Sequence, residues 1–211
     1  AAGRPLERSI GTLMTIAENI ARIRANMAAA AREAGRDPKE ILLVGASKMN
    51  DAAACREAVA AGIDALGENR VQEMVQKLEQ HAYDGAPLHF IGHLQRNKVK
   101  QVVGHVALIQ SVGSLELLDE IEKVAAARGL VQDILLEVNI GREAAKSGFA
   151  PEKVLPAAEA ALERTHVRVR GLMTIPPADA QRDANFRYFQ EVQALYVDMN
   201  QKLFHNELEY L

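Results

Sequence analysis

The feature that most constrains the fold is a regular alternation of short apolar runs with longer segments of helical periodicity. The first helix is predicted over residues 14–34, because apolar residues from Ile16 to Met27 follow one another at spacings of four, three and four. The run ILLVGAS, at residues 41–47, is apolar throughout, which is typical of a strand buried on both faces. The chain thus opens with one helix and one strand.

The alternation continues to the end of the chain. Helices are predicted at residues 51–62, 69–79, 95–103, 114–128, 151–164 and 184–203. Strands are predicted at residues 63–67, 88–92, 106–112, 133–140 and 166–175, and residues 207–211 resemble the start of a seventh. With no long linker or composition shift, we expect a single domain over residues 1–211. Periodicity leaves two α/β folds open, a doubly wound sheet and a (β/α)8 barrel.

Composition narrows the class of protein. Hydrophobic residues make up 48% of the chain but aromatic residues only 4%, so the core must be aliphatic. The net charge of -3 argues against nucleic acid as a partner. A lone cysteine, Cys55, favours a reducing compartment. No run approaches the length of a membrane span, and the first residues lack the apolar region of a signal peptide. We therefore expect a cytoplasmic protein without a membrane partner.

Both folds place ligand chemistry at the carboxyl ends of the strands, where Lys48 is the most informative residue. Partial desolvation next to a buried strand would lower the pKa of its amine and favour the neutral nucleophile, which can attack an aldehyde. Alternatively, Lys48 turns into solvent or pairs with Glu68 or Asp51. The residues alone favour this second interpretation.

For three other residues at or near strand ends, a ligand contact must likewise be weighed against a structural role. Asn69 is either a ligand contact or the N-cap of the following helix, and the cap is favoured. His89 is more typical of a hydrogen-bonded core residue than of a metal ligand, because His93 and His105 give no metal spacing with it. Met173 is more often a packing residue. No phosphate-binding glycine loop, nucleophile elbow or zinc-protease motif is present, and no metal site is predicted.

Several segments together are specific to a known family. They are LLVGASK, LGENRVQE, LHFIGHLQRNK, IQSV, LLEVNIGREAAKSGF and RGLMTIPP, in this order. The chain closely resembles the pyridoxal-phosphate homeostasis proteins (YggS- or PROSC-like proteins). The resemblance implies a TIM-type (β/α)8 barrel like the N-terminal domain of alanine racemase, which resolves the choice of topology.

The resemblance also implies a cofactor site. Lys48 would hold pyridoxal 5'-phosphate (PLP) as a covalent aldimine, and Asn69, His89 and Met173 would line the pocket. Lys146 lies in the family's K-S-G loop, with a less defined role. The chain stops at Leu211, where family members continue with segments that supply most of the phosphate cradle. We therefore expect an incomplete barrel with an exposed strand edge, phosphate-binding residues beyond Leu211, weakened cofactor affinity, and a natural protein that is longer or has a mobile tail.

The expected function is storage and delivery of PLP and limitation of free aldehyde, without a catalytic reaction or catalytic residues. PLP-dependent apo-enzymes would be the partners of a monomeric protein. The alternative is an amino-acid racemase or decarboxylase of the same fold type. That chemistry needs an acid/base group on the second cofactor face, for which this chain has no second domain. A third reading, a regulatory binding module, has no exposed signature in the sequence.

Overall fold

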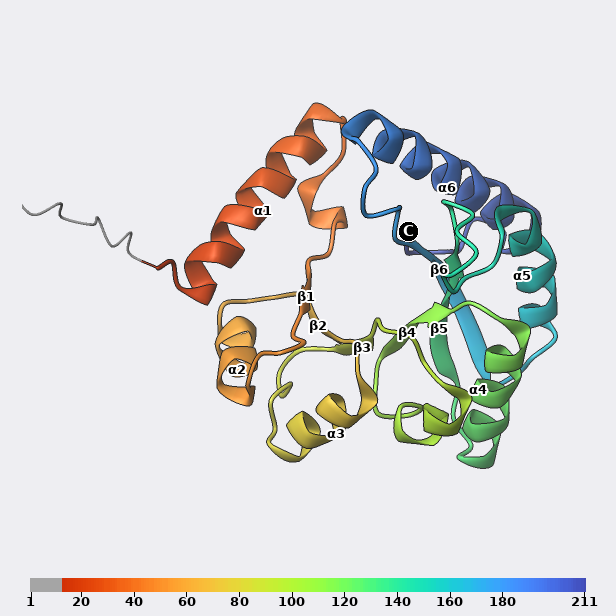
Figure 1. Cartoon of the computed structure of the whole chain (residues 1–211), viewed down its shortest axis with the longest axis horizontal. Coiled ribbons are helices and arrows are strands. Elements are labelled where there is room, and N and C mark those ends of the chain that lie inside the picture. The colour runs from red at the N-terminus through yellow and green to blue at the C-terminus, as the bar shows by residue number, and fades with distance from the viewer. Residues whose placement is uncertain (1–12) are drawn as a thin grey trace, which may run out of the picture.

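The computed structural model describes residues 13–211, and the N-terminal segment on which the signal-peptide prediction rested lies outside them. Six strands alternate with helices along the chain (Figure 1). The strands are β1 (Val44–Ala46), β2 (Ala65–Glu68), β3 (Leu88–Phe90), β4 (Leu108–Val112), β5 (Gln132–Val138) and β6 (Val167–Thr174). The α-helices are α1 (Ile16–Glu33), α2 (Ala52–Ala60), α3 (Val71–Glu79), α4 (Leu115–Ala127), α5 (Val154–Leu162) and α6 (Arg182–Leu203). Three 3-10 helices are η1 (Pro38–Glu40), η2 (Arg96–Gln101) and η3 (Pro151–Lys153).

The strands form one sheet in the order β1-β2-β3-β4-β5-β6, and every neighbouring pair is parallel. A doubly wound sheet would reverse its strand order at a switch point, whereas a barrel follows the chain order. The helices lie outside the curved sheet (Figure 1). The predicted barrel is therefore confirmed.

The predicted seventh strand begins where expected. Tyr210 forms a parallel bridge with Gly171 of β6, and the Leu172 amide donates to the Tyr210 carbonyl at 3.2 Å. A side chain at position 171 would meet that carbonyl oxygen at 1.7 Å, so the close approach requires glycine. On the other side, β1 pairs with β2 alone among residues 13–211. The barrel is thus incomplete between Tyr210 and β1, as predicted.

The burial predicted for the first strand is wrong. The strand covers Val44–Ala46 rather than residues 41–47, and its residues are half-buried or exposed. Leu42, just before it, is 47% exposed. A strand is buried on both faces only when packed neighbours cover them, and here one face borders an open cavity of about 580 Å³ inside the barrel.

The helix predictions hold with small changes at the ends. The predicted caps form, since the side chains of Asp51 and Ser114 accept hydrogen bonds from the amides of Ala54 and Leu117. The segment predicted as a helix at residues 95–103 is the 3-10 helix η2. No helix among the described residues is long and apolar enough to cross a membrane.

Candidate functional site

Lys48 lies in a turn at the carboxyl end of β1, directly after the buried residue Ser47. Its side chain is exposed, and its amine has no ion-pair or hydrogen-bond partner within residues 13–211. The partial desolvation predicted for Lys48 is therefore wrong, and the favoured alternative, a side chain turned into solvent, is confirmed. The predicted alternative partners are engaged elsewhere: Glu68 pairs with Lys77, and Asp51 caps α2.

Asn69 follows the last residue of β2, and its alternative role as a helix cap is wrong. The N-cap of α3 is Arg70, and no side chain caps that helix. Asn69 Oδ1 is inaccessible to solvent and has no hydrogen-bond partner among the described residues. A buried acceptor without a donor is uncommon in folded proteins.

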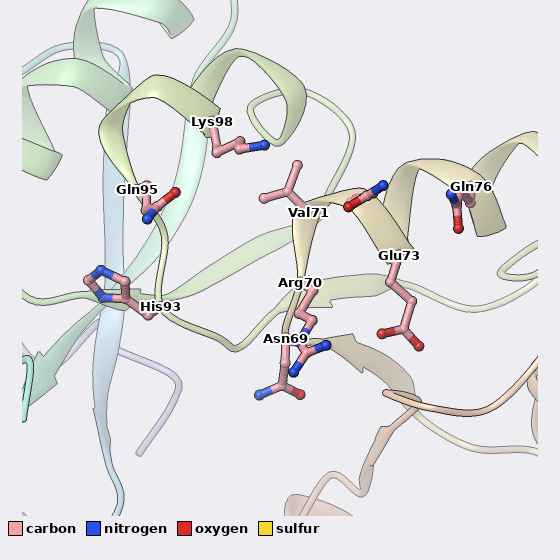
Figure 2. A pocket seen from close by; sticks show the side chains of 9 residues that line it. Asn69, Arg70, Val71, Glu73, Gln76, His93, Gln95 and Lys98 are labelled. Atoms are coloured by element: carbon pink, nitrogen blue, oxygen red, sulfur yellow. The ribbon is translucent and has the colours of Figure 1, made fainter.

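The loop after β3 packs closely against Asn69. A side chain at Gly92 would meet the Asn69 carbonyl oxygen at 2.1 Å, so glycine allows the two loops to touch. Figure 2 shows Asn69 and His93 on these loops, with Lys98 on η2 above them. These residues line a surface pocket of about 400 Å³ together with Arg70.

His89 and Met173 come together inside the barrel, where both line the 580 Å³ cavity. His89 Nδ1 lies 2.9 Å from Nε2 of Gln110, a residue of β4. An amide nitrogen donates, so Nδ1 accepts, and burial lowers the pKa of His89. Both effects keep the imidazole neutral. Gln110 lies within the strand predicted at residues 106–112, but nothing in the sequence links it to His89.

The structure separates the four predicted site residues into two groups. His89 and Met173 lie in the barrel interior, whereas Lys48 and Asn69 lie at the carboxyl ends of β1 and β2. Parallel pairing of β1 with β2 and of β2 with β3 brings these strand ends to the same rim. No single cavity among the described residues contains all four, and the prediction that they share one cofactor pocket stays a prediction.

Lys146 lies in the long loop after β5 and forms an ion pair with Glu143 at 2.7 Å. The next residue, Ser147, donates to Glu137 on β5 at 3.3 Å. Burial raises the pKa of Glu137, against the opposite influence of that hydrogen bond. A third cavity, of about 420 Å³, is lined by Lys146, Ser147, Glu137 and His93 among others. Sequence reasoning missed Glu137, which reads as one polar residue within an apolar strand.

A buried charged network lies beneath the Lys48 turn. Glu68, fully buried at the end of β2, accepts through Oε1 from Ser47 Oγ at 2.5 Å, Lys77 Nζ at 2.7 Å and Tyr83 Oη at 2.9 Å. Burial opposes the charged form of Lys77, but the hydrogen bonds to Glu68 and Glu73 outweigh it, and its pKa is raised. Burial together with Glu68 also raises the pKa of Tyr83. This network is the largest feature of the site that sequence reasoning missed.

The match to a family of known domains gives the class of protein. Residues 19–208 match the family described as "Alanine racemase, N-terminal domain", and the chain belongs to it. An alanine racemase of Clostridium difficile has the same fold, with a TM-score of 0.63 at 19% identity over 89% of this chain and 47% of that one.

Curated relatives then give the particular family. The pyridoxal phosphate homeostasis protein of Pseudomonas aeruginosa is 39% identical over 188 residues, covering 89% of this chain and 82% of the relative. The protein of the same name from Aquifex aeolicus is 40% identical over 182 residues, covering 86% and 80%. The chain is therefore a member of the pyridoxal phosphate homeostasis protein family.

Solved structures agree with this assignment. A protein of unknown function from Bifidobacterium adolescentis has a TM-score of 0.84 at 31% identity, covering 89% of this chain and 80% of that one. PipY of Synechococcus elongatus, solved with PLP bound, has a TM-score of 0.76 at 28% identity, covering 89% and 83%.

Proposed function

We propose that this protein binds pyridoxal 5'-phosphate covalently through Lys48 and serves in PLP homeostasis, by storing and delivering the cofactor and limiting free aldehyde. The observation that carries the proposal is the unpaired Lys48 amine at the rim of a barrel whose relatives are named for PLP homeostasis. A relative of the same fold was solved with PLP bound.

The residues present fit the cofactor in part. When bound, PLP supplies an aldehyde that condenses reversibly with a lysine amine. Lys48 offers an accessible amine that no neighbour within residues 13–211 engages, and Asn69 follows the end of the neighbouring strand β2. His89 and Met173 line the interior beneath the rim. The proposal assigns no phosphate cradle to the described residues.

The proposal includes the absence of turnover. Racemisation or decarboxylation requires a group that moves a proton on the far side of the cofactor. His89 is buried, burial lowers its pKa, and its Nδ1 accepts from Gln110, and the proposal gives it no part in proton transfer. We further propose that the protein is monomeric and cytoplasmic, and that it releases the cofactor to PLP-dependent apo-enzymes.

Reductive trapping tests the proposal. The protein is mixed with PLP and reduced with borohydride, and the modified lysine is located by peptide mass spectrometry. We expect modification at Lys48. Before reduction, the visible absorbance band of the PLP–lysine imine should be lost in Lys48→Ala. The matched control is Lys123→Ala, which removes an exposed lysine of α4 and should leave the band unchanged.

Two results would contradict the proposal. Equal modification of Lys48→Ala and the unchanged protein would remove Lys48 from the attachment role. Racemisation of an amino acid above the rate with free PLP, abolished in Lys48→Ala, would show an enzyme instead of a carrier.

A further inference from the structure

We propose that Lys77 and Glu73, both on α3, are positioning residues that hold the Lys48 turn in place from below. This inference rests on the proposed function of Lys48 and deepens it. Neither side chain was predicted to belong to the site.

Lys77 is buried, with 5% of the residue exposed, which is rare for lysine. Its ammonium has three donors, and all three are used: Ser47 O at 2.7 Å, Glu68 Oε1 at 2.7 Å and Glu73 Oε1 at 2.9 Å. With no free donor and almost no exposure, Lys77 is not placed to contact a ligand. Its role is therefore to hold other groups.

Two of the contacts of Lys77, to Ser47 and to Glu73, lead to the residues on either side of Lys48 in the chain. Ser47, the preceding residue, is held through its carbonyl by Lys77 and through its hydroxyl by Glu68. Met49, the following residue, donates its amide to Glu73 Oε1 at 2.7 Å. The same Glu73 oxygen accepts from Lys77, so one ammonium supports the backbone on both sides of Lys48.

The turn requires such support. Met49 has a φ of 63°, in the left-handed region that side chains disfavour. Lys48 itself is exposed, so no packing of its own side chain fixes the turn. Hydrogen bonds to charged groups are among the stronger ones in proteins, and here two of them replace the missing packing. The geometry leaves the Lys48 side chain free while its backbone is fixed.

Glu73 provides the sharper test, because its side chain is 23% exposed and its removal leaves the Lys77–Glu68 pair intact. Glu73→Ala removes the acceptor of the Met49 amide, whereas Glu73→Gln retains an acceptor oxygen. The control is Glu122→Ala, which removes a partly buried carboxylate that accepts from the His166 amide at 2.8 Å. Unfolding by urea is measured for all three variants, so that a general loss of stability is recognised.

Two readouts are used. Hydrogen exchange of the Met49 amide is measured without any cofactor, and the rate at which PLP modifies Lys48 is measured by borohydride trapping. We expect Glu73→Ala to speed Met49 exchange by about tenfold or more and to slow Lys48 modification by about tenfold to a hundredfold. Glu73→Gln should restore most of both, and Glu122→Ala should change neither.

The inference is overturned if Glu73→Ala leaves Met49 exchange unchanged, or if exchange rises while Lys48 reacts at its original rate. A Lys48 that does not react with PLP in the unchanged protein would defeat the proposed function instead. In that case the exchange measurement still decides whether Glu73 anchors the turn. Lys77→Met provides a second variant, expected to combine faster Met49 exchange with a lower urea midpoint, because Glu68 then remains buried without its cation.

Discussion

The two neighbouring strands β1 and β2 differ more in their surroundings than in their sequences. The residues VGA of β1 are all apolar, whereas ALGE of β2 ends in the charged Glu68, yet β1 is half-buried or exposed and every residue of β2 is buried. β2 pairs on both sides and α3 packs against it, whereas β1 pairs on one side among the described residues. A strand of this barrel is buried when a strand lies on each side of it, and an apolar sequence alone does not ensure burial.

The largest expected effect on stability distinguishes a leucine in the middle of the sheet from one beside β1, the strand at the open edge of the barrel. Leu136, on β5, is fully buried, whereas Leu42 is 47% exposed. Leu136→Ala should lower the free energy of unfolding by about 2–5 kcal/mol, because it removes packed side-chain contacts and leaves a cavity. Leu42→Ala should cost less than about 1 kcal/mol, since little apolar area returns to water. Urea unfolding measures both variants, and equal losses of unfolding free energy would contradict the distinction between the middle of the sheet and its open edge.

A smaller effect is expected at the other open side. Gly171→Ala would place a side chain against the Tyr210 carbonyl and displace the start of the seventh strand. We expect a loss of about 1–3 kcal/mol and, more specifically, faster hydrogen exchange at the Leu172 amide, which donates to that carbonyl. The nearby Val169→Ala serves as a control for general destabilisation of β6. Unchanged Leu172 exchange in Gly171→Ala would show that Tyr210 does not depend on this contact.

The smallest expected effect is a pH dependence inside the barrel. Burial lowers the pKa of His89 below its ordinary value of 6.5, so the unfolded chain binds the proton more readily than the folded one. The contribution of neutral His89 is fully present above about pH 6.5 and is lost as the pH falls from there through the folded pKa. Urea midpoints compared between pH 8 and pH 5 should fall less in His89→Gln than in the unchanged protein. An identical fall in both would remove His89 as the source.

Much of the fold was predictable because its signals are local. The alternation of apolar runs with helical segments located all six strands, and Asp51 and Ser114 marked two helix starts correctly. Periodicity could not distinguish a barrel from an open sheet, because both use the same strand–helix units; the family motifs supplied that choice. The exposure of Leu42 was not predictable, since it depends on whether another strand covers β1.

The site was predictable only where chemistry and position coincide along the chain. Lys48 and Asn69 were recognised as candidates because each polar residue directly follows a predicted strand or its last residues. The pairing of Glu68 with Lys77 was missed because a carboxylate and an ammonium nine residues apart give no sign that both are buried together. Their pairing arises when β2 and α3 pack beneath the turn, a tertiary arrangement that single-sequence patterns do not contain.

If the proposed PLP site includes Asn69, and binding opens its unpaired oxygen to the ligand, that oxygen bears on selectivity as well as on affinity. An inaccessible acceptor without a donor raises the free energy of the empty site, and a ligand that places a donor there removes that penalty. A ligand of the same shape with an acceptor or a methyl group at that point leaves the penalty in place. Such unmet polar groups discriminate between similar molecules far more strongly than apolar contacts do. Under that proposal, the barrel mouth would reject close analogues of PLP even where they fill the same space.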